Sequence, residues 1–567
     1  MTRKALLCAA QILFLIFAAA IPAAAADKQS GTSADTSQEV HQLKVQLADQ
    51  QRQIEELRAA LQKLVADRQQ AAPDGSVQPA SVQAPASGPP QLGQVASTTP
   101  IVPVAPATRA PLVLPMPAVA PPQMAMAESP LQLHIGSATI TPVGFMDFTA
   151  VFRTTNPGSG IGTNFGSIPY NSAINGNNSE LRLSAQNSRV GIRVDANVRG
   201  ASVLGYMESD FLGFLPTNAA VTSNSDSMRL RLYWVDVRKD KVELFGGQSW
   251  SMLTPNRKGL SALPGDLFYS QVIDVNYQNG LTWSRNPQFR FILHPNNKVA
   301  MGISLENPEQ YIGGSGGGGL VTLPAALATP YATQLNNGGT SLSVPDVHPD
   351  IIAKVAFDPS SRAHVEVAGV FRTFRVYNPL NTTHYTANGF GGSANFNFEL
   401  AKGFRVVSNN YFSDGGGRWI FGLAPDVVVR PDGSLSALHA SSTLDGFELQ
   451  IKKTLFYTYY GGTFIGKNAV VDATGKYVGY GYPGSPNSQN KNIHEPTFGL
   501  TQTFWRDPKY GALQLMLQYS YLLRNPWDVA PGAPSNAHAS MVFLNLRYLL
   551  PGSAPVPELP KLPLKTP

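Results

Sequence analysis

Between residues 131 and 550, apolar and polar residues alternate along the chain in short runs rich in Phe, Tyr, Val and Leu. In the run 540–549, Leu544 lies on an apolar face and Asn545 on a polar one, and the run 445–453 alternates in the same way. A period of two predicts β-strands, and charges on the face opposite the apolar one are typical of a transmembrane barrel with a water-filled lumen. A soluble β-sandwich also alternates, so this pattern alone leaves both classes open.

The connectors between these runs have two lengths. Short polar turns, such as 197–200 and 358–361, alternate strictly with long stretches rich in Gly, Asn, Ser and Pro, at 154–179, 213–226, 251–272, 307–348, 378–389, 414–443, 467–494 and 525–536. Outer-membrane barrels have short periplasmic turns and long extracellular loops, whereas a sandwich gives no reason for this asymmetry. We therefore predict an all-β fold, a transmembrane antiparallel β-barrel of about sixteen strands over 131–550.

A different periodicity occupies residues 38–68, within the segment 27–70. Apolar residues recur there at spacings of three and four, which predicts an α-helical coiled coil with a single polar residue in its seam. The predicted core residues are Val40, Leu43, Leu47, Gln50, Ile54, Leu57, Leu61 and Leu64. A helix this short is marginal alone, so it implies partner helices, although a single amphipathic helix packed on another surface is the alternative.

The remaining segments complete the organisation of the chain. Residues 1–26 read as a secretory signal peptide, with Arg3 and Lys4 before an apolar core and an alanine run at the expected cleavage site. Residues 71–130 hold many prolines and no aromatic residue, which predicts an extended spacer. Residues 551–567 form a Pro-rich C-terminal tail. This order places the coiled coil and the spacer in the periplasm.

Composition excludes several other classes of protein. Only 14% of the residues are charged, and beyond the N-terminus there is no apolar run long enough for a membrane-spanning helix. Loss of Arg3 and Lys4 with the signal peptide takes the net charge from +6 to +4, which is too mild to indicate a nucleic-acid partner. The one cysteine, Cys8, lies in the signal peptide, so we expect no disulfide in the mature chain.

Three segments of the barrel region resemble trimeric porins. The sequence NSRVGIR at 187–193 resembles their second strand, and the segments 230–235 and 242–248 resemble the hairpin before their inward-folded third loop. The order of signal peptide, coiled coil, Pro-rich spacer and barrel is similar to that of the DcaP-like family of trimeric outer-membrane transporters. This resemblance implies a homotrimer of sixteen-stranded barrels in the outer membrane that passes small anions, including dicarboxylates. The chain departs from porins at its end, where the tail follows Leu550 in place of a terminal aromatic residue.

Strand alternation also predicts which charges face the lumen. Val190 and Ile192 are expected to face lipid, and so are Leu230 and Leu232, which turns the charged residues between them inward. The inward charges predicted in this way are Arg189, Arg193, Glu208, Asp210, Arg229, Arg231 and Arg290. They are either hydrated wall charges or, as a set on neighbouring strands, the lining of a constriction. Because the parity of Leu181 and Leu183 differs from that of Val190, a β-bulge is expected near Gln186.

The segment that follows the fifth strand carries further charges. Arg257, Lys258 and Asp266 lie in 251–270, which either folds into the pore and narrows it or remains an ordinary surface loop. Arginine suits carboxylate solutes because its planar guanidinium offers two donors side by side. The sequence thus predicts a constriction with an excess of positive charge.

No motif indicates an enzyme, a cofactor or a metal site. The string at 313–317 matches a nucleophile-elbow pattern but lies in a glycine tract without a strand before it or a helix after it. The leading hypothesis is an outer-membrane porin for passive diffusion of small anionic solutes, which the family resemblance implies include dicarboxylates. The alternatives are a structural tether, whose coiled coil and spacer reach toward the cell wall, and a barrel-embedded hydrolase.

Overall fold

The computed structural model describes residues 131–213, 227–268, 270–314, 317–338, 344–346 and 348–551. The expected signal peptide, coiled coil and Pro-rich spacer lie outside the described residues, and so does the tail from residue 552.

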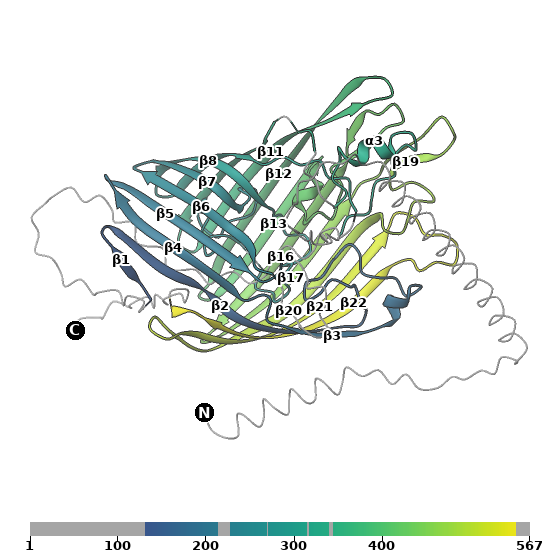
Figure 1. The fold of residues 1–567 in the computed structure, drawn as a ribbon. Helices are drawn as coiled ribbons and strands as arrows, with labels where there is room; N and C mark the ends of the chain where they lie inside the picture. The colour runs from purple at the N-terminus through teal and green to yellow at the C-terminus, as the bar shows by residue number, and fades with distance from the viewer. Residues whose placement is uncertain are drawn as a thin grey trace, which may run out of the picture. The chain divides into compact units, whose positions relative to one another are not determined.

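The described chain forms a closed antiparallel barrel of sixteen strands (Figure 1). Its first half is built from β2 (Ala138–Arg153), β3 (Glu180–Ser184), β4 (Arg189–Val198), β5 (Ala201–Asp210), β6 (Arg229–Lys239), β7 (Val242–Trp250), β8 (Arg285–Asn296), β9 (Val299–Glu306) and β10 (Asp350–Ser360). Its second half is built from β11 (Ala363–Asn378), β12 (Thr383–Ala401), β13 (Phe404–Asp414), β16 (His439–Ile451), β17 (Thr454–Ile465), β20 (Asn490–Asp507), β21 (Gly511–Pro526) and β22 (Ala537–Leu549).

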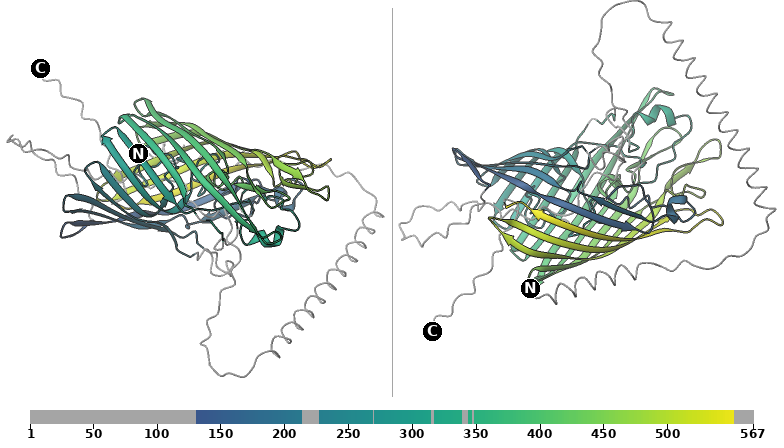
Figure 2. Two further views of the ribbon diagram at one scale, coloured as in Figure 1. Left: turned by 90° about the horizontal axis from the view of Figure 1, so that it is seen from above. Right: turned by 60° about the horizontal axis from the view of Figure 1, so that its bottom comes forward.

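The short strand β1 (Leu133–Ile135) pairs with the start of β2. The short elements outside the barrel sheet are β14 (Val427–Val429), β15 (Leu435–Ala437), β18 (Asn468–Val471), β19 (Tyr477–Tyr480), η1 (Ile174–Asn177), η2 (Gly417–Trp419) and α3 (Ala328–Ala332). α3 and β19 lie at one end of the barrel in Figure 1, and both views of Figure 2 show the wall strands running obliquely. No helix among the described residues is long and apolar enough to cross a membrane.

β2 closes the ring because it pairs with the last strand on one side and with β3 and β4 on the other. Thr149 pairs with Ser184 and Phe145 with Arg189, so the three residues between them on β2 face the four residues 185–188. That one extra residue is the bulge expected near Gln186. It divides one barrel strand into β3 and β4 and changes which residues face inward.

The two faces of the wall differ in chemistry as the alternation predicts. Outward residues such as Phe289, whose exposed fraction is 72%, are apolar. On the last strand, Asn545 and Arg547 are buried inside the barrel, while Leu546 between them is exposed. This arrangement suits a wall with lipid outside and a polar lumen.

Connector lengths match the expected asymmetry with one exception. The segment 378–389 is not a long loop, because β11 and β12 continue as a ladder up to the pair Asn378 and Thr383. The stretch is rich in Thr, Asn and Gly, which resembles a loop in composition, but its backbone groups are paired across the hairpin.

Candidate functional site

Three neighbouring strands bring arginines and carboxylates together on the inner wall. Glu208 and Asp210 lie on β5, between Arg189 of β4 and the two arginines of β6. The Nε of Arg231 lies 2.7 Å from Glu208 and its Nη1 lies 2.8 Å from Asp210. Arg189 lies 3.3 Å from Glu208, and Arg229 lies 2.8 Å from Asp210. The sequence analysis placed these five residues on the inner wall of neighbouring strands, and the structure brings them into contact.

The β6 backbone places Arg231 differently from the expected alternation. Glu208 pairs with Leu232 while the next residue, Ser209, pairs with Leu230, so Arg231 is an extra residue in the strand. As a result Leu232 is fully buried, and the prediction that it faces lipid is wrong. The bulge turns Arg231 and Leu232 both toward the inside of the barrel, and this lets Arg231 reach two carboxylates.

Arg285 belongs to the same cluster and was missed by the sequence analysis. The guanidinium of Arg285 lies 5.3 Å from the ring of Trp250, and that of Arg231 lies 5.6 Å from the same ring. Arg285 is the first residue of β8, paired with Trp250 at the end of β7, where strand alternation no longer gives a clear direction. The sequence offered only its closeness to the third loop as a signal.

Several buried donors in this cluster have no hydrogen-bond partner. They are Nε and Nη2 of Arg189, Nη2 of Arg231 and Nε of Arg285. We use the name arginine cluster for Arg189, Arg229, Arg231 and Arg285 together with Glu208 and Asp210. With four guanidinium groups and two carboxylates, the cluster carries an excess of positive charge and spare donors, and both favour anions.

The other two wall arginines predicted for the constriction stand apart from this cluster. Arg193 donates from Nε and Nη2 to the Asp195 carboxylate, both at 2.7 Å. Arg290 donates from Nε to Gln288 at 2.7 Å, and its guanidinium lies 4.8 Å from the ring of Phe245. Both side chains are inward and buried, as predicted.

The segment between β7 and β8, residues 251–284, folds into the barrel. The backbone N–H of Thr282 donates to Asn409 of β13 at 2.9 Å, and that of Gln271 donates to the Tyr459 hydroxyl of β17 at 3.1 Å. Asn279 donates to the backbone oxygen of Ile493 in β20 at 2.9 Å. These strands lie across the lumen from β7 and β8, so this third loop crosses the interior and narrows it.

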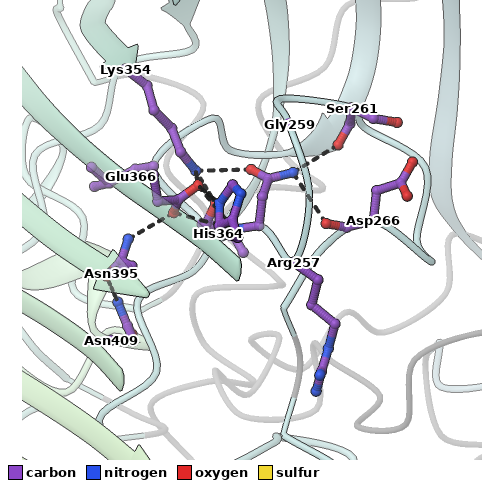
Figure 3. Close-up of polar contacts among 12 residues, drawn as sticks. Arg257, Gly259, Ser261, Asp266, Lys354, His364, Glu366, Asn395 and Asn409 are labelled. Atoms are coloured by element: carbon purple, nitrogen blue, oxygen red, sulfur yellow. Dashed lines mark hydrogen bonds and ion pairs between the residues drawn. The ribbon is translucent and has the colours of Figure 1, made fainter. Parts of the chain in front are cut away.

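A buried ion pair fixes the first limb of the third loop to the wall (Figure 3). Lys354 of β10 lies 2.8 Å from Glu366 of β11, and it also donates to Thr254 at 2.8 Å and to Asn256 at 2.9 Å. Glu366 in turn accepts from the backbone N–H of Asn256 at 3.2 Å and from Asn395 at 2.8 Å. The loop backbone is thus part of the charge pair's hydrogen-bond network.

His364 extends this attachment toward the short turn 358–361. One ring nitrogen lies 3.1 Å from Glu366 and the other lies 2.8 Å from Asp358, which also accepts from the backbone N–H of Gly259 at 2.9 Å. We call Lys354, His364, Glu366 and Asp358 the loop anchor. Strand alternation indicated that His364 and Glu366 face inward, but nothing in the sequence linked them to residues a hundred positions earlier.

The charged residues of the third loop lie beyond the anchor. Arg257 points away from Lys354 in Figure 3 and donates to Glu448 of β16 at 2.9 Å. Burial alone would lower the pKa of Arg257, but the adjacent Glu448 carboxylate outweighs burial and raises it. Asp266 binds back within the loop, where its backbone oxygen accepts from the N–H of Arg257 at 2.7 Å. Lys258 is exposed.

Arg405 of β13 is a further lumen cation that the sequence analysis did not single out. Its side chain is 24% exposed, and its Nη2 lies 3.6 Å from a carboxylate oxygen of Glu399. The positive charge of Arg257 lies close enough to repel that of Arg405. Its neighbours Phe404 and Val406 are apolar, so alternation alone would have turned Arg405 inward. Among the described residues no group of three or more His, Cys, Asp or Glu side chains is arranged to hold a metal ion.

A closed sixteen-stranded barrel with a long segment folded inside is the fold of outer-membrane channels. Among solved structures the chain is similar to the outer membrane channel DcaP of Acinetobacter baumannii, with 15% identity and a TM-score of 0.54 over 73% of this chain and 97% of DcaP. This confirms the expected resemblance at the level of the fold.

Two other solved structures are similar at lower scores. The anion-selective porin from Comamonas acidovorans has 9% identity and a TM-score of 0.40, over 73% of this chain and 99% of the porin. OmpT, an outer membrane protein of Vibrio cholerae, has 10% identity and a TM-score of 0.39, over 74% of this chain and 99% of OmpT. No family model matches the sequence, and no curated protein matches it either.

Proposed function

We propose that this protein is an outer-membrane porin through which small anionic solutes diffuse passively, with dicarboxylates preferred. The observation that carries the proposal is the arginine cluster on the inner wall beside the third loop. Four guanidinium groups face two carboxylates there, so the cluster holds a net positive charge. A fixed charge in a narrow passage with low-dielectric walls attracts ions of the opposite sign and repels the others.

The cluster acts mainly through its field, because most of its side chains are closed to solvent. Arg229, with a side chain that is 19% exposed, and Arg285 are partly exposed. Direct contacts to a solute are assigned to cations that reach open space on the other side of the lumen. These are Arg257, Lys258 and Arg405, near the tip of the third loop. A solute with two carboxylates can engage two of them at once, which favours dicarboxylates over single-headed acids.

Binding at these cations has to be weak for a solute to leave. Affinities in the micromolar to millimolar range, roughly −8 to −4 kcal/mol, allow both entry and release. The partial neutralisation of Arg257 by Glu448 and of Arg405 by Glu399 is consistent with such weak binding. Two arginines without carboxylate partners, in a site that excludes water, would bind a dicarboxylate much more tightly.

The proposal includes a homotrimer in the outer membrane of a Gram-negative bacterium, with residues 27–130 in the periplasm. The heptad pattern of residues 38–68 and the resemblance to trimeric porins support it. Native mass spectrometry of the full-length protein in detergent tests this part directly. A trimer mass is expected, and a monomer would contradict it.

Liposome swelling tests the solute class. Proteoliposomes should swell faster in a C4 dicarboxylate than in a diamine of equal length, because the wall charge repels the diamine. Arg285→Gln should reduce this difference, because Arg285 contributes to the positive excess without an ion pair of its own. Lys298→Gln removes one exposed charge at a periplasmic turn and serves as the matched control. A folded barrel that admits neither solute would leave the tether or the hydrolase as the function.

A further inference from the structure

A row of polar side chains crosses the outer wall on β13, β16 and β17. Asp445 of β16 pairs with Ser408 of β13 on one side and with Tyr460 of β17 on the other. Asp445 has the same parity as Phe447 and Leu449, whose exposed side chains mark the outer face, and it is exposed itself. The carboxylate therefore points out of the barrel.

The row lies midway between two aromatic rows. Four residues toward the periplasmic turns, Phe404 pairs with Leu449 and Leu449 with Phe456. Four residues the other way, Phe412 pairs with Ser441 and Ser441 with Phe464. Four residues span about 13 Å along a strand, or about 10 Å of height at a tilt of about 40°. The aromatic rows are thus about 20 Å apart, close to the apolar band of about 25 Å that aromatic girdles border.

The polar groups in this patch are already ordered by one another. Ser408 Oγ donates to Asp445 at 2.6 Å, and Thr443 Oγ1 donates to the second carboxylate oxygen at 2.8 Å. Asn410 contacts both hydroxyls, at 2.8 Å and 3.0 Å. We call Ser408, Asn410, Thr443, Asp445 and Tyr460 the outer polar patch. On β8, β9 and β10, by contrast, the exposed outward side chains are apolar, including Phe291, Ile303 and Val355.

A carboxylate at mid-bilayer height is unfavourable against lipid, since acyl chains offer no hydrogen-bond donor. We propose that a second copy of this chain covers the outer polar patch, related to the first by a twofold axis along the membrane normal between β16 and β17. Such an axis keeps every residue at its own height. It places Asp445 of each copy opposite Tyr460 of the other, because these two residues are direct neighbours on paired strands.

The patch is self-complementary in the way a twofold contact requires. Tyr460 is partly exposed, and its hydroxyl lies 2.7 Å from Nδ1 of His494. With the proton on Nδ1, His494 donates to the Tyr460 oxygen and leaves the phenol proton free for the partner's Asp445. The same geometry occurs twice across the axis. Gly462 on β17 shares the outward parity of Tyr460 and is covered by the Tyr460 ring, which lies flat along the outer wall.

This contact is separate from the homotrimer. A threefold assembly uses two different faces of each subunit, whereas the outer polar patch pairs with itself. The contact therefore joins neighbouring assemblies side by side in the membrane. It goes beyond the proposed transport of anions and does not depend on it.

Cysteine cross-linking in membranes tests the proposal, because Cys8 is the one cysteine of the chain and lies in the predicted signal peptide. Thr458 of β17 shares the outward parity of Tyr460 and is close to the proposed axis, so the variant Thr458→Cys places a cysteine at the contact. Ile303→Cys, on the exposed outer face of β9, is the control far from the patch. The full-length variants are reconstituted into phospholipid vesicles, oxidised and separated by gel electrophoresis, and folding is checked by the heat-dependent mobility of the barrel.

The expected result is a covalent dimer for Thr458→Cys with at least tenfold higher yield than for Ile303→Cys. Adding Asp445→Leu to Thr458→Cys should reduce that yield to the control level while the barrel remains folded. Equal yields from the two folded cysteine variants would overturn the proposal. A cross-link formed in native membranes only to a different protein would overturn it as well, and would assign the patch to that partner.

Discussion

Arg231 and Glu208 form an ion pair of 2.7 Å in which both side chains are closed to solvent. The desolvation of two charges makes such a pair weak evidence for stability, but removal of one partner leaves the other charge buried and unpaired. Arg231 also neutralises Asp210, so it holds two carboxylates of the inner wall at once. Its position depends on the bulge of β6 and not on ordinary strand alternation.

Replacing Arg231 with Met should destabilise the barrel by about 1 to 3 kcal/mol, because Glu208 keeps only the longer ion pair to Arg189 and Asp210 keeps only Arg229. The measurement is unfolding in guanidinium chloride followed by tryptophan fluorescence. Arg285→Met should cost far less, because Arg285 forms no ion pair with another described residue. Equal losses of stability in the two variants would contradict the role assigned to Arg231.

The loop anchor should control the width of the passage. In the double variant Lys354→Met with Glu366→Gln, neither charge remains unpaired, so the wall should fold while Thr254 and Asn256 lose the Lys354 ammonium as a donor. The first limb of the third loop is then less restrained. We expect a higher single-channel conductance with more current noise. Arg362→Gln, in an exposed short turn, is the control, and an unchanged conductance in the double variant would show that the anchor does not set the width.

Acidification should stabilise the packing of the fourth long connector. Burial, reinforced by the charge of Asp350, raises the pKa of Asp346 to about 7. The folded protein therefore binds a proton at Asp346 that the unfolded chain releases above about pH 4. Stability should fall as the pH rises from about 4 to about 7, by about 1 to 4 kcal/mol in total. Asp346→Asn should remove this slope in denaturant unfolding at pH 5 and pH 8, and an identical slope in the variant would refute the assignment.

Solute binding should depend on the cations near the tip of the third loop. Arg405→Ala and Lys258→Ala should each weaken the block of chloride current by a dicarboxylate by roughly tenfold, because a charge-assisted contact contributes about 1.5 kcal/mol or more. Block by a monocarboxylate should weaken less, since a single head group needs only one of the two cations. If both acids lose affinity equally, the two cations do not act together on one solute.

The sequence was sufficient for the architecture because strand parity and connector length are local properties. Leu546 faces outward and Arg547 inward, as the alternation of 540–549 requires. The bulge near Gln186 was also predictable, because the parity of the apolar residues changes on either side of it. The second bulge, at Arg231, was not, since Leu230 and Leu232 are both apolar and give no sign that one of them is buried.

The site was predictable only where its residues share a strand or a hairpin. Arg189, Glu208 and Arg231 were brought together by the order of β4, β5 and β6. The contacts of the third loop join residues far apart in sequence, such as Asn256 with Glu366, and no local pattern encodes them. The alternation of apolar and polar residues likewise gives the face on which Asp445 lies, but not its height in the barrel wall.

The reversal potential of single channels across a potassium chloride gradient tests the central claim most directly. The positive excess of the arginine cluster predicts that chloride passes more readily than potassium, and that Arg285→Gln moves the reversal potential toward cation preference. Arg285→Gln is a cleaner variant than the loss of Arg229 and Arg231, which would leave Asp210 unpaired. Cation preference in the wild-type channel would contradict the account, even if the barrel and its third loop stand as described.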